Sequence, residues 1–493
     1  MISLHLPILQ VVVPLMAAPT CMILRNGRAA WVLALVITWT AFAVALSLLR
    51  QVIDSGPISY AIGGWAPPWG IEYRVDILNA CVLVIVTSIG AVVVPFARAS
   101  VEREVASDRI YLFYTMYLLC LAGLLGITIT GDAFNLFVFL EISSLSSYVL
   151  ISLGRDRRAL TAAFRYLIMG TIGATFYIIG VGMMYMVTGT LTIADLAARL
   201  PAMADSRTVH MALAFLTVGI SLKLALFPLH LWLPNAYAYA PTAVTVFLAA
   251  TATKVAVYVM FRIVYTVFGG PAIFEQVPID QMLMGFGMLA MIGASLVAVF
   301  QSNVKRLLAY SSLSQIGYMI LGLSLANVTG IAGGIVHLFN HAMMKGALFM
   351  AMGCVFYRVG SVQIDALAGL GRRMPFTMAG VVVGGLSLIG APLTVGFVSK
   401  WYLIQGALER GLWPVALVIL ASGLLALIYV WRIVEAAYFR PSPDGATGIR
   451  EAPLSMLIPL GILSAACIVF GIDATATMDL AFAAARSLLG IAP

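Results

Sequence analysis

The sequence predicts an all-α membrane protein of about 14 transmembrane helices that contains two inverted five-helix repeats. The composition is the first reason, because 62% of the 493 residues are hydrophobic and only 10% are charged, against about 25% charged residues in soluble domains. So few charges cannot cover a water-facing surface, so the bilayer must be the main solvent. The second and third reasons are a regular series of long apolar runs and a pair of repeated motifs.

Fourteen apolar runs are long enough to be spans, which need about 20 residues each. They cover approximately residues 5–24, 30–51, 76–97, 110–129, 133–153, 161–188, 209–233, 242–268, 281–301, 307–327, 331–357, 375–407, 412–438 and 453–472. The first run lacks the basic segment that precedes a cleaved signal sequence, so we expect it to be retained. The last twenty residues are expected to form a short amphipathic tail or a frayed end.

Basic residues test the number and orientation of the spans. The odd-numbered loops contain fifteen of them: Arg25, Arg28, Arg98, Arg103, Arg109, Arg155, Arg157, Arg158, Lys305, Arg306, Arg358, Arg372, Arg373, Arg440 and Arg450. The even-numbered loops and their flanks contain six: Arg50, Arg74, Arg199, Arg207, Arg262 and Arg410. Cytoplasmic loops are enriched in such residues. We therefore expect a multi-pass membrane protein with both termini outside, and we interpret the net charge of +8 as loop charge rather than a nucleic-acid surface.

Two motifs recur at similar offsets. Ser-Ser-Leu-Ser occupies residues 143–146 and again 311–314, and a Gly-Ile-Ser-Leu or Gly-Leu-Ser-Leu segment begins at residues 219 and 385. A Pro-Leu pair follows each of the latter, so the spans 209–233 and 375–407, the seventh and twelfth, are expected to be broken. Repeats of five spans, an odd number, must be inverted relative to each other, which is typical of transporters.

The repeats divide the chain into four predicted regions. Residues 1–109 contain spans 1–3, residues 110–270 the first repeat with spans 4–8, residues 271–440 the second repeat with spans 9–13, and residues 441–493 span 14 and the tail.

Lysine is distributed differently from arginine. Four of the five lysines, Lys223, Lys254, Lys345 and Lys400, lie within predicted spans, and only Lys305 is placed in a loop. A charge at mid-membrane costs about 2.5–3.5 kcal/mol on insertion scales. Arginine stays protonated, whereas a buried lysine can release its proton near neutral pH. The pattern indicates proton loading and unloading; the alternative is that each lysine reaches the interface or forms a structural pair.

Glu141 is the only glutamate deep inside a predicted span. Lys223 precedes the predicted break of the seventh span, so the two side chains are candidates for a pair in the helix bundle. Pairing favours the charged lysine and separation favours the neutral one, so the pair is a candidate proton switch. A static buried ion pair is the alternative.

The eleventh span carries His337, His341 and Lys345 at intervals of four residues. This spacing places all three on one helix face over about 12 Å. Histidine titrates near neutral pH, so the stripe suits a proton relay along the membrane. Metal binding is a weaker alternative, because no carboxylate or cysteine completes a ligand set.

Other polar residues carry less specific signals. His230 lies near the end of the seventh span, where it either faces an exit path or caps the broken helix. Arg432 and Glu435 are candidates for a pair at the interface. The five cysteines are scattered without metal-ligand spacing, and no nucleotide-binding fingerprint occurs. We therefore expect neither a metal nor a cofactor.

The region around Lys223 and Lys254 resembles the core signature of a known family. The segment 223–236 reads Lys-Leu-Ala-Leu-Phe-Pro-Leu-His-Leu-Trp-Leu-Pro-Asn-Ala, residues 240–243 read Ala-Pro-Thr-Ala, and Tyr258 and Arg262 follow Lys254. Residues 390–393, Gly-Ala-Pro-Leu, precede Lys400 in a similar way. The chain resembles antiporter-like subunits of respiratory complex I, energy-converting hydrogenases and Mrp cation/proton antiporters over about residues 70–440. In length and detail it resembles the D-type subunit of Mrp antiporters.

This resemblance implies roles for the buried residues. Glu141 and Lys223 would be the coupled pair, Lys254 and the histidines of the eleventh span the central relay, and Lys400 the far terminus. Which of the three titratable residues of the eleventh span occupies the relay position stays open. Lys400 departs from a similar complex I subunit, which has glutamate there.

Three functions are compared. The first is a proton-translocating subunit of a multi-subunit Na⁺/H⁺ antiporter in the bacterial plasma membrane, with other membrane subunits as partners and protons and monovalent cations as cargo. The second is a pump subunit of a redox complex whose redox centres belong to other chains, so that this chain is not itself an enzyme. The third is a scaffold in which lysines only hold helices together. Na⁺ prefers oxygen ligands and the interior is basic, so sodium binding is expected to depend on a partner.

Overall fold

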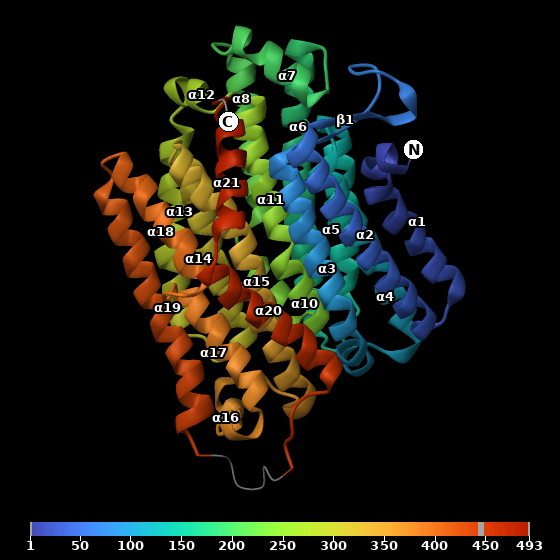
Figure 1. The fold of residues 1–493 in the computed structure, drawn as a ribbon, viewed down its shortest axis with the longest axis vertical. Helices are drawn as coiled ribbons and strands as arrows, with labels where there is room; N and C mark the ends of the chain where they lie inside the picture. Colours follow the sequence, from blue (N-terminus) through green and yellow to red (C-terminus); the bar gives the residue numbers. More distant parts are fainter. Residues whose placement is uncertain (1, 442–447, 492–493) are drawn as a thin grey trace.

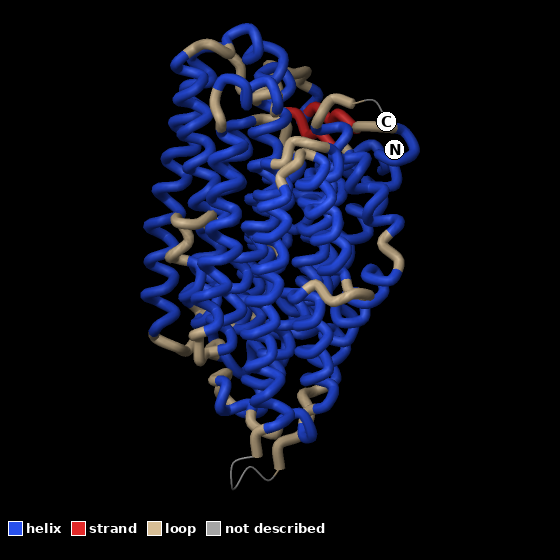
Figure 2. Tube along the Cα trace, turned by 90° about the vertical axis from the view of Figure 1, so that its left-hand side faces the viewer, coloured by secondary structure: helices blue, strands red, loops and turns tan. Residues whose placement is uncertain are grey.

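The computed structural model describes residues 2–441 and 448–491, which are almost entirely helical. Most helices run along the long axis of the molecule, with loops gathered at its two ends (Figures 1 and 2). Residue 1 of the predicted region 1–109, and residues 442–447 and 492–493 of the predicted region 441–493, lie outside the described residues. The predicted all-α class is confirmed.

The helices and strands have the following bounds. The first half contains α1 Leu6–Leu24, α2 Gly27–Ser55, α3 Ile77–Glu104, α4 Ile110–Ile129, α5 Ala133–Ser152, α6 Arg158–Thr188, α7 Ile193–Arg199, α8 Arg207–Leu224, α9 Leu233–Tyr239, α10 Thr242–Ala250 and α11 Ala252–Phe261. The second half contains α12 Pro271–Gln276, α13 Ile279–Val299, α14 Val304–Ser324, α15 Val328–Val359, α16 Leu370–Arg373, α17 Pro375–Ile389, α18 Val395–Glu409, α19 Trp413–Phe439, α20 Leu454–Ile472 and α21 Thr475–Leu488. Strands β1 Ile58–Ala61 and β2 Glu72–Val75 form an antiparallel hairpin.

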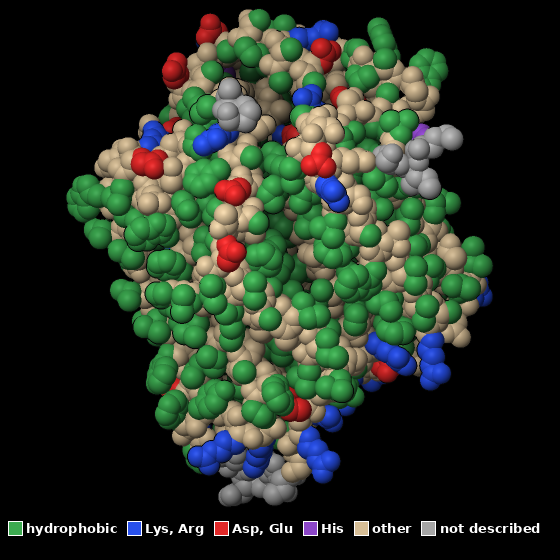
Figure 3. Space-filling view, in the orientation of Figure 1, with side chains coloured by type: hydrophobic (Ala, Val, Ile, Leu, Met, Phe, Trp, Pro, Cys, Tyr) green, Lys and Arg blue, Asp and Glu red, His purple; other side chains and the backbone are tan. Residues whose placement is uncertain are grey.

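Thirteen helical segments of the described chain are long and apolar enough to cross a membrane. The predicted span 375–407 is the additional one, because it is divided into α17 and α18, which are too short individually. The outward faces carry apolar side chains such as Trp39, Phe164 and Leu424, and the face drawn in Figure 3 is largely hydrophobic between its two ends. Lipid offers no hydrogen bonds, so such an apolar surface around closed helices is what a bilayer requires. The chain is a multi-pass membrane protein.

The two ends of the molecule differ in charge. The described termini lie at the same end (Figure 1), which we call the terminal end; it also carries the β1–β2 hairpin. The opposite, arginine-rich end carries the loops between α1 and α2, α3 and α4, and α5 and α6, and Figure 3 shows lysine and arginine gathered there. A shared end for both termini agrees with an even number of crossings. Which end faces outward stays a prediction.

Both predicted helix breaks are present. The predicted span 209–233 is wrong at its end, because α8 ends at Leu224, Ala225 takes a left-handed conformation with φ 59°, and a turn continues to α9. Pro228 lies in this turn, and a proline has no backbone N–H to continue a helix. Between α17 and α18, Gly390 has φ 92° and Pro392 follows. A third break, which the sequence did not predict, separates α10 from α11 at Thr251.

The two predicted repeats begin at opposite ends of the molecule. Helix α4, the first of the region 110–270, runs to the terminal end, where Thr130 pairs with Tyr73 of β2. Helix α13, the first membrane-spanning helix of the region 271–440, runs the other way, and beyond it Asn303 pairs with Gln363 at the arginine-rich end. These opposite directions fit inversion, and the exact boundaries of the four regions stay a prediction.

The tail is a packed helix rather than a frayed end. Helix α21 contacts α15 and α3, and its buried side chains include Ala481, Ala484 and Ala485. Small residues on this face allow close approach between helices. The expectation of a frayed end is therefore wrong for the described residues, and the amphipathic alternative describes the segment.

Candidate functional site

Seven of the eight candidate residues form a row through the middle of the bundle. Helix α5 supplies Glu141, α8 supplies Lys223, α11 supplies Lys254, α15 supplies the two histidines and Lys345, and α18 supplies Lys400. The lysines and histidines of this row are all buried.

One end of the row is an ion pair. Lys223 Nζ lies 3.1 Å from Glu141 Oε1 and donates a second hydrogen bond of 2.8 Å to Ser144 Oγ. Lys223 occupies the last turn of α8, where unpaired carbonyls favour a cation. Its side chain is only 5% exposed, whereas that of Glu141 is 25% exposed. The carboxylate therefore borders the lateral surface and the ammonium faces inward.

A small cavity separates this pair from Lys254. It has a volume of about 30 Å³ and is lined by Ser144, Lys223 and Thr253, among others, which is room for about one or two water molecules. Thr253 Oγ1 lies 3.4 Å from Lys254 Nζ. Lys254 also donates to the carbonyl of Ala249, at the end of α10. Hydroxyls and space for water thus connect the two lysines.

Helix α15 continues the row with stacked imidazoles. The rings of His337 and His341 are nearly parallel with centroids 5.9 Å apart. His337 Nδ1 lies 2.7 Å from Ser399 Oγ, whereas neither ring nitrogen of His341 has a hydrogen-bond partner among the described residues. Lys345 donates to the Leu308 carbonyl at 2.9 Å and to Ser311 Oγ. Helix α10, which ends just before Lys254, packs against α15, and α11, which contains Lys254, packs against α14.

Lys400 closes the row. Its ammonium donates hydrogen bonds of 3.0 and 2.7 Å to the carbonyls of Leu388 and Ile389, at the end of α17. It also lies 5.0 Å from the ring centre of Tyr318. The Tyr318 ring is 5.6 Å from that of His337, so this tyrosine lies between the α15 stripe and the final lysine.

Three of these lysines share one structural setting. Lys223, Lys254 and Lys400 each lie beside the C-terminal end of an interrupted helix, namely α8, α10 and α17. The last carbonyls of a helix have no partner within it. Broken helices near the middle of the membrane place such carbonyls beside transported ions in many transporters. Proline residues predicted the breaks after α8 and α17. No residue in 250–254 predicted the break after α10.

His230 is not part of the row. It lies in the turn between α8 and α9 rather than at the end of a helix, and its ring stacks on Phe227 at 5.1 Å. Its Nδ1 has no partner among the described residues. No hydrogen bond or ion pair joins it to the other candidates within residues 2–441 and 448–491.

The role of His230 stays a prediction, whereas two other expectations are wrong. Lys305 is not a loop residue: it lies in the first turn of α14, is 4% exposed, and donates to the Ala240 carbonyl at 2.9 Å and to Thr242 Oγ1 at 3.2 Å. The Asn303 side chain, which caps α14, starts the helix earlier than hydropathy indicates. Glu435 pairs with an arginine other than Arg432.

Glu435 and Arg432 each have a different partner. Arg440 contacts Glu435 at 2.8 Å, at the end of α19. Arg432 instead donates to the carbonyls of Val299 and Gln301. Arg432 is thus bound by carbonyls at the end of α13 rather than by the Glu435 carboxylate.

The chemistry available in the row is proton exchange. Within the described residues, no group of three or more histidine, cysteine or acidic side chains is placed to hold a metal ion. The groups present are amines, imidazoles, hydroxyls and one carboxylate, all of which donate, accept or relay protons. An ionisable residue buried at membrane depth is by default a hypothesis for a functional site.

Fold and site together define a polytopic membrane protein with a titratable interior. The chain belongs to the transmembrane family described as NADH:quinone oxidoreductase/Mrp antiporter, whose model matches residues 130–426. The family resemblance seen in the sequence is confirmed.

Two similar proteins are named as subunits of different complexes. The chain is 41% identical to the N subunit of NADH-quinone oxidoreductase of Desulforudis audaxviator over 95% of this chain and 96% of that protein. It is 30% identical to the D-type subunit of the Na⁺/H⁺ antiporter of Alkalihalophilus pseudofirmus over 87% of this chain and 86% of that protein.

Similar solved structures also come from a respiratory complex and from an Mrp complex. A chain of an archaeal membrane-bound sulfane sulfur reductase is 31% identical with a TM-score of 0.91, covering 98% of both chains. A chain of the Mrp complex from Dietzia sp. DQ12-45-1b is 26% identical with a TM-score of 0.90, covering 99% of this chain and 98% of that one. Both are multi-subunit membrane complexes, so membrane-embedded partner subunits are the common setting of this fold.

Proposed function

We propose that this protein is the proton-translocating subunit of a multi-subunit monovalent cation (Na⁺)/proton antiporter in the bacterial plasma membrane. The observation that carries the proposal is the continuous row from Glu141 to Lys400. Each member lies beside a hydroxyl, a carbonyl, another titratable group or room for water. Burying four amines inside one membrane bundle costs too much free energy to be explained by solubility alone.

In this mechanism the Glu141–Lys223 pair acts as a switch. When the two are together, the carboxylate stabilises the ammonium; when they separate, the ammonium is left without its counter-charge and releases its proton. The proton passes by way of the small cavity to Lys254. A charged Lys254 in turn repels charge on the α15 stripe, which hands the proton on to Lys400.

The α15 stripe offers a specific candidate for the central relay. His341 stacks on the ring of His337, and both of its ring nitrogens lack a hydrogen-bond partner among the described residues. A buried polar group without a partner is costly unless water reaches it or it has a functional role. We assign the relay position to His341, with His337 held in place by Ser399 and Lys345 held by α14.

Sodium binding is assigned to the assembled complex rather than to this row. Na⁺ prefers carboxylate and carbonyl oxygens, and the row contains a single carboxylate already paired with Lys223. Protons would therefore move through this chain, and the cation would bind where partner subunits supply further oxygen ligands.

The test measures the pH gradient of everted vesicles after Na⁺, K⁺ or Li⁺ is added, with all subunits of the complex co-expressed. Glu141→Gln and Lys223→Ala are each expected to abolish the exchange while the complex still assembles. Glu102→Gln is the matched control, because Glu102 is an exposed glutamate at the end of α3. Full exchange by both variants in an assembled complex would favour the scaffold function instead.

A second candidate function is a proton-pumping subunit of a redox complex, similar to complex I or a membrane-bound reductase. The observation that favours it is the higher identity to the NADH-quinone oxidoreductase relative than to the antiporter relative, 41% against 30%. The row would operate in the same way, driven by electron transfer in other subunits. Purifying the native complex decides between them: partners with iron–sulfur or quinone sites support the redox complex, and small membrane subunits without them support the antiporter.

A further inference from the structure

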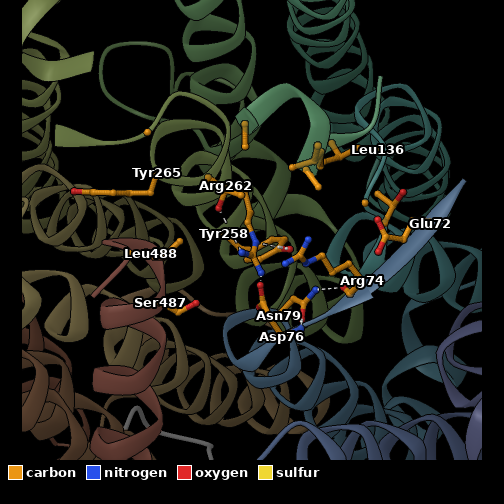
Figure 4. A pocket seen from close by; sticks show the side chains of 18 of the residues that line it. Glu72, Arg74, Asp76, Asn79, Leu136, Tyr258, Arg262, Tyr265, Ser487 and Leu488 are labelled. Carbon is orange, nitrogen blue, oxygen red and sulfur yellow. Dashed lines mark hydrogen bonds and ion pairs between the residues drawn. The ribbon is translucent and has the colours of Figure 1, made fainter. Parts of the chain in front are cut away.

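A large cavity opens at the terminal end of the molecule, away from the row described above. Its volume is about 500 Å³, enough for roughly 15 water molecules at about 30 Å³ each. Its wall combines β2, the start of α3, the end of α11 and the last residues of α21 (Figure 4). We call this cavity the vestibule.

The inner wall of the vestibule is closed by three linked side chains. Arg262 contacts Asp76 at 2.5 Å, and both side chains are largely buried, at 12% and 14% exposure. Arg262 Nε also donates to Tyr258 Oη at 3.1 Å, and Tyr258 donates to the Thr128 carbonyl at 2.9 Å. Figure 4 shows Arg262 reaching from its helix toward Asp76, with Tyr258 beside it.

These side chains stand directly above Lys254 on the same helix. Lys254, Tyr258 and Arg262 are spaced by four residues, so they follow one face of α11 and of the π-helical turn that continues it, with a rise of about 6 Å per step. Tyr258 and Arg262 line the vestibule, whereas Lys254 is fully buried. The helix changes to a π-helix at Arg262, an irregularity that often accompanies functional sites.

We propose that the vestibule is an aqueous path for protons between Lys254 and the terminal end, and that the Asp76–Arg262 ion pair with Tyr258 is its gate. The proposal rests on the proposed function, because Lys254 must carry a proton for the gate to matter. When the pair separates, Tyr258 loses the guanidinium that holds its hydroxyl, and water from the vestibule reaches the level of Lys254. When the pair re-forms, the path is closed.

The charges of the vestibule favour a gate over a site for a fixed ion. Arg74 and Glu72 lie on the same wall as the ion pair (Figure 4), so two guanidiniums and two carboxylates balance each other. Neither a bare cation nor an anion meets an excess of the opposite charge. Water, the carrier of protons, needs only such polar lining.

Accessibility tests the gate without relying on transport. In a variant with all five native cysteines replaced by alanine, Lys254→Cys is exposed to a membrane-impermeant thiol reagent from either side of the vesicle. Trp69→Cys, at an exposed site of the hairpin, marks the terminal end. We expect Asp76→Asn to raise the labelling rate of Lys254→Cys from that end by about tenfold or more, because removing one partner of a largely buried pair shifts a two-state equilibrium at least that far.

Matched variants separate a gate from a structural pair. Asp195→Asn breaks an ion pair at the same end, 3.1 Å long but half-exposed, and is expected to leave the labelling rate unchanged. If Lys254→Cys does not assemble, Ala256→Cys, which lines the small cavity between Lys223 and Thr253, reports the same accessibility. Equal labelling with and without Asp76→Asn would overturn the proposal.

Exchange measurements distinguish failure of the gate from failure of the proposed function. We expect Asp76→Asn and Arg262→Gln each to dissipate an imposed pH gradient faster than wild type without added Na⁺. We expect the double variant Asp76→Arg with Arg262→Asp to recover part of the low proton leak of wild type. Loss of exchange in Glu141→Gln together with unchanged leak and labelling in the gate variants would refute the gate alone. Full exchange in Glu141→Gln and Lys223→Ala would refute the function beneath it.

Discussion

Lys400 reaches back across the break between α17 and α18 and donates a 2.7 Å hydrogen bond to the carbonyl of Ile389, the last residue of α17. The contact joins a titratable group to the end of a different helix segment. Lys254 makes the equivalent contact with Ala249 at the end of α10. In both places the ammonium replaces a backbone donor that the broken helix lacks.

Replacing the lysines by arginine separates charge from proton release. Lys254→Arg and Lys400→Arg keep a cation that donates to the same carbonyls, but arginine does not deprotonate in proteins. We expect assembled complexes with less than about a tenth of normal exchange, a loss typical of removing proton transfer. The measurement is Na⁺-driven pH change in everted vesicles, normalised to complex content.

Lys305→Arg is the control for this series. Lys305 lies beside a cavity of about 260 Å³ at the arginine-rich end, so a larger side chain has room, and the residue is outside the row. We expect most of the exchange to persist. Normal exchange in Lys254→Arg and Lys400→Arg would contradict proton release by these lysines.

The α17–α18 break leaves no room for a methyl group at Gly396. A Cβ there would lie 1.7 Å from the Ser387 carbonyl oxygen and 2.8 Å from its carbon, so the two helix segments must move apart. Overpacking a filled site costs about 1–3 kcal/mol or more. We expect Gly396→Ala to lower the melting temperature of the purified complex by several degrees, whereas Gly182→Ala, where a Cβ meets nothing within 4 Å, leaves it unchanged. Similar melting of both variants would contradict the tight break.

Helix α21 is expected to be essential for packing. Ala484 is fully buried and Ala483 is exposed on the same turn, so Ala484→Leu adds a larger side chain to the buried face and Ala483→Leu adds the same atoms to the exposed one. The first should destabilise the helix by about 1–3 kcal/mol through overpacking, and the second should be nearly neutral. Protease sensitivity of the C-terminal segment measures the difference, and equal sensitivity would contradict the packed helix.

The Asp76–Arg262 pair has a defined pH dependence. Burial raises the pKa of Asp76, but Arg262 and the Asn79 backbone amide lower it more, so the net pKa lies below its ordinary 3.8. A group with a lowered pKa stabilises the fold at every pH above its unfolded value and loses this contribution as the pH falls through its folded value. The difference in melting temperature between wild type and Asp76→Asn should thus be constant from about pH 5 to 8. A difference that grows across this range would point to another titrating group.

The sequence predicted the architecture well because hydropathy and loop charge are strong signals in membranes. Span positions and two helix breaks followed from apolar runs and from Pro228 and Pro392. The break at Thr251 did not, because no proline or glycine marks it in residues 250–254. The end of α8 was misplaced because the apolar turn after Leu224 looks like helix.

The candidate row was predictable in its members but not in its connections. Lysine inside spans is rare enough to identify Lys223, Lys254, Lys345 and Lys400 individually. The groups that link them, such as Thr253, Tyr318 and Ser399, are ordinary residue types whose positions depend on helix rotation and on contacts distant in sequence. Asp76 and Arg262 are 186 residues apart, so only the fold brings them together.

The helix break beside Lys400 couples the proton affinity of this lysine to the relative position of α17 and α18. Two carbonyls of α17 are satisfied by an ammonium that belongs to α18, so the free energy of binding a proton there includes the free energy of holding the two segments in register. Thermodynamic linkage is reciprocal. Under the proposed function, a neighbouring protein that separates the two segments would therefore lower the proton affinity of Lys400, and proton release from Lys400 would favour that separation by the same free energy.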